Sequence, residues 1–328
     1  MSEFFAAYGL FLLELITLAA VLIVAIALVV ANARRGGEHE GLSVKHLNEQ
    51  MERTAQGVQR VLLPKEQFKK ETKALAKAHK ERRRGKAKGG SERGRTFVLD
   101  FKGDLRASAA ASLREEISAV LAVARDGDEI LLRLENAGGA VHEHGFAASQ
   151  LLRLKQRGLR LTVAVDKVAA SGGYLMACVA DWVVAAPFAI VGSIGVIAQL
   201  PNFRRLLEEK GVDVEQITAG RYKRTLTLFG ENTEEGRQKL KEELEDVHAL
   251  FKAQIAAHRP QVDIERVATG EHWYGSQALE LELVDEIRTS DDYLLAAASK
   301  KDLYQITFKR RRALAERILG GAQSLLSR

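Results

Sequence analysis

Apolar and polar positions divide the chain into an apolar N-terminal run, a polar middle and a long remainder in which apolar segments recur. Residues 10–31 are almost wholly apolar. About 20 such residues in a helix cross the hydrocarbon core of a bilayer. We therefore predict an N-terminal transmembrane helix within residues 1–33. A cleaved signal peptide is the alternative, but no positively charged segment precedes the run. Glu14 interrupts the run near one end, where a carboxylate can reach the interface.

The polar middle is predicted to be a basic, partly helical linker over residues 34–94. It contains a helical stretch at 65–79, followed by a run rich in Arg, Lys and Gly at 81–90. Such a composition buries little apolar surface. Attraction to anionic lipid headgroups fits this linker. Nucleic-acid binding does not, because no aromatic residues interleave with the charges.

From residue 96 onward, predicted strands alternate with predicted helices. The strands are 96–101, 129–134, 159–166, 182–186, 189–196 and 213–218, and the helices are 107–125, 141–157, 174–180, 201–210 and 233–258. This alternation indicates right-handed βαβ units and a parallel sheet. We predict an α/β domain at 95–300, followed by a C-terminal strand and a basic amphipathic tail at 301–328.

The charge distribution shows which part of the chain is basic, and the cysteine content shows whether a disulfide can form. Residues 34–95 hold 18 Lys and Arg against 8 Asp and Glu, whereas the whole chain holds 49 against 43. The other residues therefore hold 31 against 35, so the positive charge belongs to the linker and the α/β domain is mildly acidic. Cys178 is the single cysteine in the chain, which rules out an internal disulfide and leaves the redox compartment open.

Candidate chemistry centres on Ser171, which follows a buried strand and precedes a Gly-Gly pair and an apolar helix. A serine at a helix N-terminus lies beside unpaired N–H groups that stabilise developing negative charge. A helix-capping serine is the alternative. Paired glycines also follow the strand at 129–134, so we expect the Gly139 and Gly172 N–H groups to form an oxyanion hole. A tight strand-to-helix turn would explain the glycine pair after the 129–134 strand equally well.

A serine nucleophile needs a base. Histidine is the usual choice, but the chain has no histidine between His144 and His248. A lysine whose pKa is lowered by burial can do the same work. Lys223, in a basic loop after the predicted strand at 213–218, is the candidate, with an ordinary solvated lysine as the alternative.

Several motifs in order resemble the signal peptide peptidase A family of serine proteases, peptidase family S49. They are the segments 169–174, 189–196, 220–224, 270–275 and 283–285. The resemblance implies that Ser171 is the nucleophile, that Lys223 is the general base and that Ser193 orients the lysine amine. It also implies oxyanion donation by Gly139.

The resemblance carries further expectations. The fold would be a ClpP/crotonase-like stack of ββα units, and the chain would be a homo-oligomeric, single-pass protein of the cell inner membrane. It would act on peptide or unfolded protein substrates without a metal or cofactor. Two departures from the family pattern are Asn136-Ala137 in place of Ser-Pro, and Glu282 in place of a glycine.

Two other functions and the membrane face stay open at this point. A crotonase-like acyl-CoA enzyme would use the same glycine amides without a Ser-Lys pair. A membrane-tethered scaffold would carry a vestigial dyad. Arg34 and Arg35 beside the predicted span favour a cytoplasmic domain, whereas the resemblance implies the opposite face.

Overall fold

The computed structural model describes residues 8–21, 41–87 and 93–310. The chain divides into two compact units, one made of residues 1–43 and 308–328 and the other of residues 44–307. In the first unit, residues 8–21 are helical. Within the described part of the chain, no helix is both long and apolar enough to span a bilayer. The second half of the predicted span, residues 22–31, and the predicted tail from 311 lie outside the described residues, so both stay predictions.

The larger unit alternates strands and helices along its length. The strands, of which β1 and β10 cross the boundary between the two units, are β1 (Gly41–His46), β2 (Arg95–Lys102), β3 (Glu129–Glu135), β4 (Arg160–Val165), β5 (Val168–Ala170), β6 (Trp182–Ala185), β7 (Ile190–Gly192), β8 (His272–Tyr274), β9 (Glu286–Ile287) and β10 (Asp302–Lys309). Its helices are α2 (Leu47–Leu62), α3 (Lys65–Ala87), α4 (Ala110–Val123), α5 (Val141–Gln156), α6 (Gly172–Ala177), α7 (Arg204–Glu209), α8 (Glu234–His258), α9 (Ile264–Val267), α10 (Gly275–Glu280) and α11 (Ser290–Lys300).

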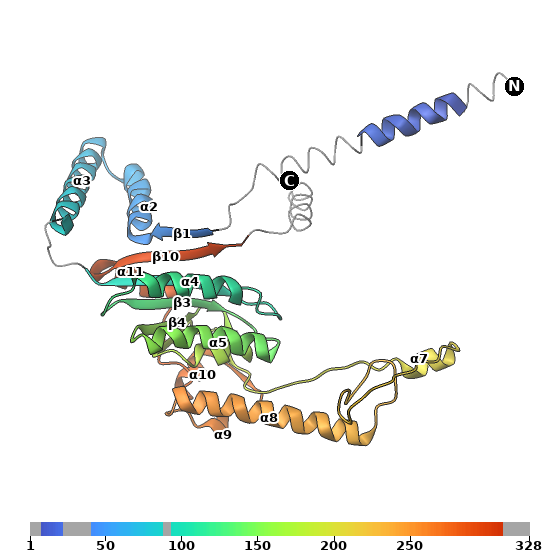
Figure 1. The fold of residues 1–328 in the computed structure, drawn as a ribbon. Helices are drawn as coiled ribbons and strands as arrows, with labels where there is room; N and C mark the ends of the chain where they lie inside the picture. Colours follow the sequence, from blue (N-terminus) through green and yellow to red (C-terminus); the bar gives the residue numbers. More distant parts are fainter. Residues whose placement is uncertain (1–7, 22–40, 88–92, 311–328) are drawn as a thin grey trace. The chain divides into compact units, whose positions relative to one another are not determined.

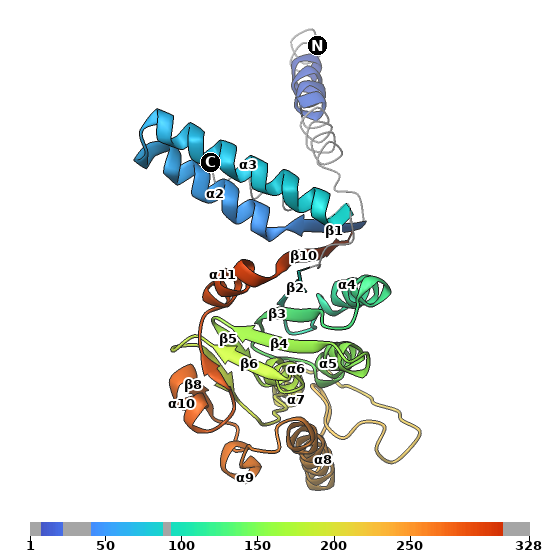
Figure 2. The same cartoon turned by 90° about the vertical axis from the view of Figure 1, so that its left-hand side faces the viewer.

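Seven strands form the main sheet, in the order β1-β10-β2-β3-β4-β6-β9. Every pairing from β10 to β9 is parallel. Figure 1 shows α4 and α5 lying along this sheet, and Figure 2 shows its strands stacked below β1. Parallel strands need crossover connections, which the intervening helices supply. The predicted α/β class with a parallel sheet is confirmed.

Helices cover both faces of the main sheet. On β2, Phe97 and Leu99 join the core that contains α4 and α5, whereas Val98 joins a second core with Leu47 of α2 and Leu294 of α11. The same alternation holds on β3, β4 and β6. Strands buried on both faces have continuous apolar sequences. This explains why apolar runs identified the strands well.

A second, smaller sheet holds β5, β7 and β8. Strand β5 pairs with β7 in parallel, and β7 pairs with β8 in antiparallel orientation. Only Asp166 and Lys167 separate β4 from β5, so the chain leaves the main sheet and enters the small one within two residues. Residue 171 therefore lies where the two sheets diverge.

One strand prediction is wrong. Residues 213–218 form no strand, and every side chain from 212 to 224 is exposed. A strand needs a neighbour for its backbone groups and a surface on which to bury one face. This segment, between α7 and α8, has neither within the described part of the chain. The predicted helix at 201–210 is shortened to α7, and the predicted helix at 174–180 begins at Gly172 instead.

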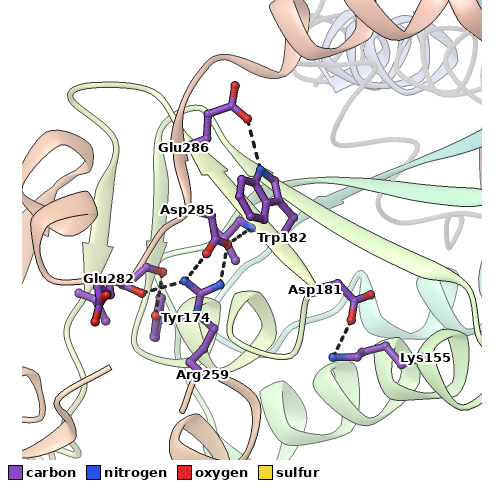
Figure 3. A network of polar contacts seen from close by, with 10 residues as sticks. Lys155, Tyr174, Asp181, Trp182, Arg259, Glu282, Asp285 and Glu286 are labelled. Carbon is purple, nitrogen blue, oxygen red and sulfur yellow. Dashed lines mark hydrogen bonds and ion pairs between the residues drawn. The ribbon is translucent and has the colours of Figure 1, made fainter. Parts of the chain in front are cut away.

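A buried ion pair joins the end of α8 to the main sheet (Figure 3). The Arg259 guanidinium, which is only 2% exposed, donates to both Asp285 carboxylate oxygens at 2.6 and 2.9 Å and to the Glu282 carbonyl at 2.8 Å. Asp285 also accepts from the Val183 N–H of β6 at 2.6 Å. The Tyr174 hydroxyl of α6 donates to the Leu283 carbonyl at 2.9 Å. Bidentate, buried pairing of this kind fixes orientation as well as distance.

Glu282 has a backbone φ of 58°, in the left-handed region that glycine adopts without strain. The glycine that the family resemblance implies at this position would adopt such a backbone conformation without strain. We predict that Glu282→Gly raises the free energy of unfolding by about 0.5 to 1 kcal/mol, because the left-handed strain exceeds the added chain entropy. Urea denaturation checks this, with Glu280→Gly in α10 as a control that should be destabilised. No gain for Glu282→Gly would contradict the assigned backbone conformation.

Candidate active site

Ser171 lies between β5 and α6 with a backbone φ of 52° and ψ of −121°. A non-glycine residue at positive φ is strained, and such strain concentrates at functional sites. The Ser171 N–H donates to the Gly192 carbonyl at 2.8 Å, which holds the residue against the end of β7. Its hydroxyl caps no backbone N–H of α6. The capping role considered from the sequence is therefore wrong, and the hydroxyl is left for another partner.

Both glycines after Ser171 are required by close contacts. A Cβ at Gly172 would overlap the imidazole ring of His144, and a Cβ at Gly173 would overlap the Asn136 carbonyl oxygen. Only residues without a side chain let α6 start this close to the chain that leaves β3. The Gly-Gly pair seen in the sequence thus sets the distance between two loops.

Asn136 organises the loop that follows β3. Its backbone bridges the β5 strand, with the Asn136 N–H donating to the Val168 carbonyl at 2.8 Å and the Ala170 N–H donating back at 3.0 Å. Its buried side-chain oxygen accepts from the Gly138 N–H at 2.9 Å and lies 3.2 Å from His144 Nε2. The loop lacks the Ser-Pro of the family pattern, and the Asn136 amide instead holds it in place.

The Gly139 and Gly172 N–H groups are candidate donors beside Ser171. Among the described residues, neither the Gly139 nor the Gly172 N–H has an acceptor, whereas the Gly138 N–H is taken by Asn136. A Cβ at Gly138 would lie 2.7 Å from the Ser171 Cβ, so the loop touches the serine. A Cβ at Gly139 would overlap the Leu105 backbone. Two free donors beside a hydroxyl are the arrangement that stabilises an oxyanion.

Two cavities meet at Ser171. The larger, of about 760 Å³, is lined by Gly139, Ser171 and Ser193 together with residues from α8. The smaller, of about 340 Å³, shares Gly139 and Ser171 but is lined mainly by apolar residues of α5, α6 and α8. A polar reacting centre beside an apolar recess is typical of sites that orient one part of a ligand while acting on another.

Ser193 reaches the larger cavity from the end of β7. It also has a backbone φ of 52°, and its N–H donates to the Glu271 carbonyl at 2.6 Å. Lys223 does not line either cavity. It is exposed on the segment between α7 and α8, in a turn where its N–H donates to the Gly220 carbonyl at 3.1 Å. Figure 1 shows α7 well apart from α5. The structure thus brings together Ser171, Gly139, Gly172 and Ser193 but not Lys223.

Helix α8 contributes ionisable residues that sequence reasoning did not select. Lys241, Glu245 and His248 line the larger cavity, and the Lys241 amine lies 3.8 Å from the Glu245 carboxylate. His248 Nε2 is buried without a hydrogen-bond partner in the described part of the chain. These residues are four and three positions apart, which places them on one face of a helix. That spacing is the sequence feature from which they could have been identified.

Neither Cys178 nor Tyr174, both buried close to Ser171 in sequence, competes with it as a nucleophile. Burial raises the pKa of the Cys178 thiol to about 12, so it carries no thiolate at neutral pH. Burial likewise raises the pKa of Tyr174. In the described part of the chain, no group of His, Cys, Asp and Glu side chains is arranged to hold a metal ion.

Comparison with known proteins identifies the family. The model of peptidase family S49 matches residues 153–304, and the model of the peptidase family S49 N-terminal region matches residues 3–151. The chain belongs to peptidase family S49. The resemblance stated from the sequence is confirmed.

Two proteins and one solved structure are similar to this chain to different degrees. The Probable protease SohB of Haemophilus influenzae is 47% identical over 326 residues, covering 97% of this chain and 92% of that protein. The Probable protease SohB of Buchnera aphidicola subsp. Acyrthosiphon pisum is 56% identical over 231 residues, covering 70% and 69%. A solved structure of the 1510-N membrane-bound stomatin-specific protease with a substrate peptide has a TM-score of 0.42 at 14% identity, covering 62% of this chain and 80% of that one.

The role of Asn136 can be tested by truncation. Asn136→Ala removes the acceptor for the Gly138 N–H and leaves that buried donor unpaired. We predict a loss of about 2 kcal/mol in the free energy of unfolding, measured by urea denaturation. Asn202→Ala, which removes an exposed loop amide with two carbonyl partners, is the control and should cost less. Equal losses for both would contradict the organising role of Asn136.

Proposed function

We propose that this member of family S49 is a membrane-anchored serine endopeptidase with Ser171 as nucleophile and Lys223 as general base. One observation carries the proposal. The Ser171 hydroxyl does not cap its helix, and Ser171 has a strained backbone conformation. It shares one cavity with Gly139 and Gly172, whose N–H groups have no acceptor in the described part of the chain. A serine serving only to cap a helix would have neither the strain nor the free donors.

In the first half of the reaction, neutral Lys223 accepts the Ser171 hydroxyl proton while the oxygen attacks the carbonyl carbon of a peptide bond. The electron pair of the carbonyl moves to its oxygen, which the Gly139 and Gly172 N–H groups bind. The Lys223 ammonium then gives the proton to the leaving amine as the C–N bond breaks, and an acyl-enzyme on Ser171 remains.

In the second half, Lys223 removes a proton from water, and the hydroxide attacks the acyl carbon through the same oxyanion hole. The proton returns to Ser171 as the ester bond breaks. The Ser193 hydroxyl, which faces the same cavity, would hydrogen-bond the amine and orient it. No step requires a metal or cofactor.

Lys223 must still reach Ser171, and we propose that a second copy of the chain supplies it. The segment from 197 to 232 carries Lys223 and exposes many apolar side chains; Ile197 is 84% exposed and Ile217 is 93% exposed. Apolar surface of this extent is stabilised by burial against a partner. If the segment packs across a neighbouring copy, Lys223 enters that copy's cavity and the homo-oligomer becomes the active form.

The apolar cavity beside Ser171 indicates the substrate. It shares Gly139 and Gly172 with the oxyanion hole, so a side chain next to the attacked carbonyl would fill it. Its volume of about 340 Å³ suits an aliphatic or aromatic side chain. We therefore propose peptide or unfolded protein substrates cut after apolar residues, at the inner membrane that the predicted span would occupy. Membership of a peptidase family favours this activity over an acyl-CoA enzyme or a scaffold.

The dyad is tested by variants of the detergent-purified full chain acting on an unfolded protein. We predict that Ser171→Ala and Lys223→Ala each lower kcat by about 1000-fold or more, with unchanged circular dichroism. Lys210→Ala, an exposed lysine of the same segment, should keep its activity. Loss of activity in Lys241→Ala or His248→Gln, with Lys223→Ala still active, would move the base to α8.

Sharing of the site between copies is tested by mixing. When Ser171→Ala and Lys223→Ala proteins assemble together at equal amounts, random neighbours give about a quarter of sites with both groups. We predict that activity returns to roughly that fraction of wild type. Mixtures as inactive as the separate variants, although assembled, would show that each site takes both residues from one chain.

The apolar cavity is tested at Gly145, where an added Cβ meets nothing within 4 Å. Gly145→Val should fold normally but fill the cavity, so cleavage after Leu or Phe should fall by about 10-fold or more while cleavage after Ala changes little. Gly57→Val, at an equally open position in α2, is the control. A uniform loss for all peptides would contradict the assigned role of the cavity.

A further inference from the structure

Helices α2 and α3 form a hairpin whose tip is Val61-Leu62-Leu63-Pro64. In Figures 1 and 2, α2 starts at the end of β1 and is joined to α3 at the end far from that strand. Leu63 caps the end of α2, and Pro64, the next residue, lacks the N–H that would continue the helix. The tip is therefore a tight connection rather than a flexible loop.

The hairpin is anchored at one end only. Asn48 donates to the Ala298 and Lys301 carbonyls at 3.1 and 2.9 Å and accepts from the Leu303 N–H at 2.7 Å. Leu47 is buried in the core beside α11. The start of α2 is therefore fixed, whereas nothing in the described part of the chain covers the tip of the hairpin.

The tip exposes apolar side chains in sequence. Val61 is 84% exposed and Leu62 is 74% exposed, and Val58 on the preceding turn is also exposed. Burial of an exposed Val or Leu side chain away from water is favourable. Adjacent apolar residues at a tip therefore favour an apolar phase or partner.

Basic residues surround these apolar side chains. Arg60, Lys65, Lys69 and Lys70 are all exposed near the tip. Over its whole length α3 has ten Lys and Arg against three Glu, so the hairpin is strongly positive. Of the acidic residues near the tip, Glu66 lies 3.4 Å from the Lys69 amine.

This combination selects among partners. A second copy of the hairpin would bring like charges together, which opposes association. Nucleic acid would satisfy the charges but leave Val61 and Leu62 in water. An anionic bilayer satisfies both, because the basic residues are attracted to the headgroups and the apolar side chains enter the acyl boundary.

We propose that the α2–α3 tip inserts into the interface of a bilayer containing anionic lipids. The hairpin thereby forms a membrane contact additional to the predicted span at 10–31. This contact does not depend on the catalytic assignment, and Ser171→Ala protein should show it equally.

The experiment measures the depth of one residue in the full-length protein. Leu62→Cys is labelled with an environment-sensitive dye, which Cys178 does not accept because it is buried. The protein is reconstituted in phosphatidylcholine vesicles with and without phosphatidylglycerol, and lipids with nitroxides at graded depths quench the dye. The control is the label at Leu295→Cys, an exposed apolar position of α11. Because depth is measured, the result is independent of what else holds the chain on the membrane.

We expect quenching and a blue shift at position 62 in phosphatidylglycerol vesicles, weaker in phosphatidylcholine alone and reversed by high salt. Replacing Lys65, Lys69 and Lys70 together by Glu should abolish both signals, whereas position 295 should stay unquenched. Three outcomes would overturn the proposal. The first is a dye at position 62 that lies no deeper in the bilayer than the dye at position 295. The second is a blue shift of the position-62 dye in detergent that grows with protein concentration. The third is a blue shift of that dye produced by added RNA instead of lipid.

Discussion

The structure of the site depends on the contact between the loop after β3 and the turn after β5. Asn136 bridges to β5 through two backbone hydrogen bonds, and Gly138 approaches Ser171 so closely that an added Cβ would lie 2.7 Å from the serine Cβ. Such a distance is open only to glycine. The contact brings Gly139 and Gly172, whose N–H groups have no acceptor among the described residues, into the lining of one cavity with Ser171. The strained backbone conformation of Ser171 is maintained because the hydrogen bonds between Asn136 and β5, and between the Ser171 N–H and the Gly192 carbonyl, fix the turn.

The rest of the fold supplies the rigidity that this contact needs. The parallel main sheet is buried on both faces, and its β3 and β4 strands end together, so the two loops start from fixed positions. The Arg259–Asp285 pair ties the end of α8 to β6, and Tyr174 ties α6 to the segment that follows α10. Groups that must be held to within a fraction of an ångström lie on elements fixed by packing. The segment with Lys223 lies outside this framework.

The amino-acid sequence predicts the framework well because its strands are continuous apolar runs between helices of ordinary length. Ser171, Gly139 and Gly172 could be selected because they lie in runs of small residues directly after predicted strands, whereas Ser193 was selected only through the family resemblance. The prediction of a strand at 213–218 was wrong because alternating apolar residues also occur in this exposed segment. The local pattern does not distinguish a paired strand from an exposed segment. The α8 face of Lys241, Glu245 and His248 was missed since its residues contact the site only after the helix folds back over it. The position of Lys223 relative to Ser171 depends on how the segment between α7 and α8 packs, and the sequence close to Lys223 does not determine that packing.

The central claim is that Ser171 is an activated nucleophile served by Lys223, and covalent capture tests it most directly. The purified, assembled protein is treated with a fluorophosphonate, digested and examined by mass spectrometry. We predict one adduct, on the Ser171 peptide, formed at least about 100-fold more slowly in Lys223→Ala protein. An adduct on another serine, or labelling of Ser171 at the same rate in Lys223→Ala protein, would contradict the account.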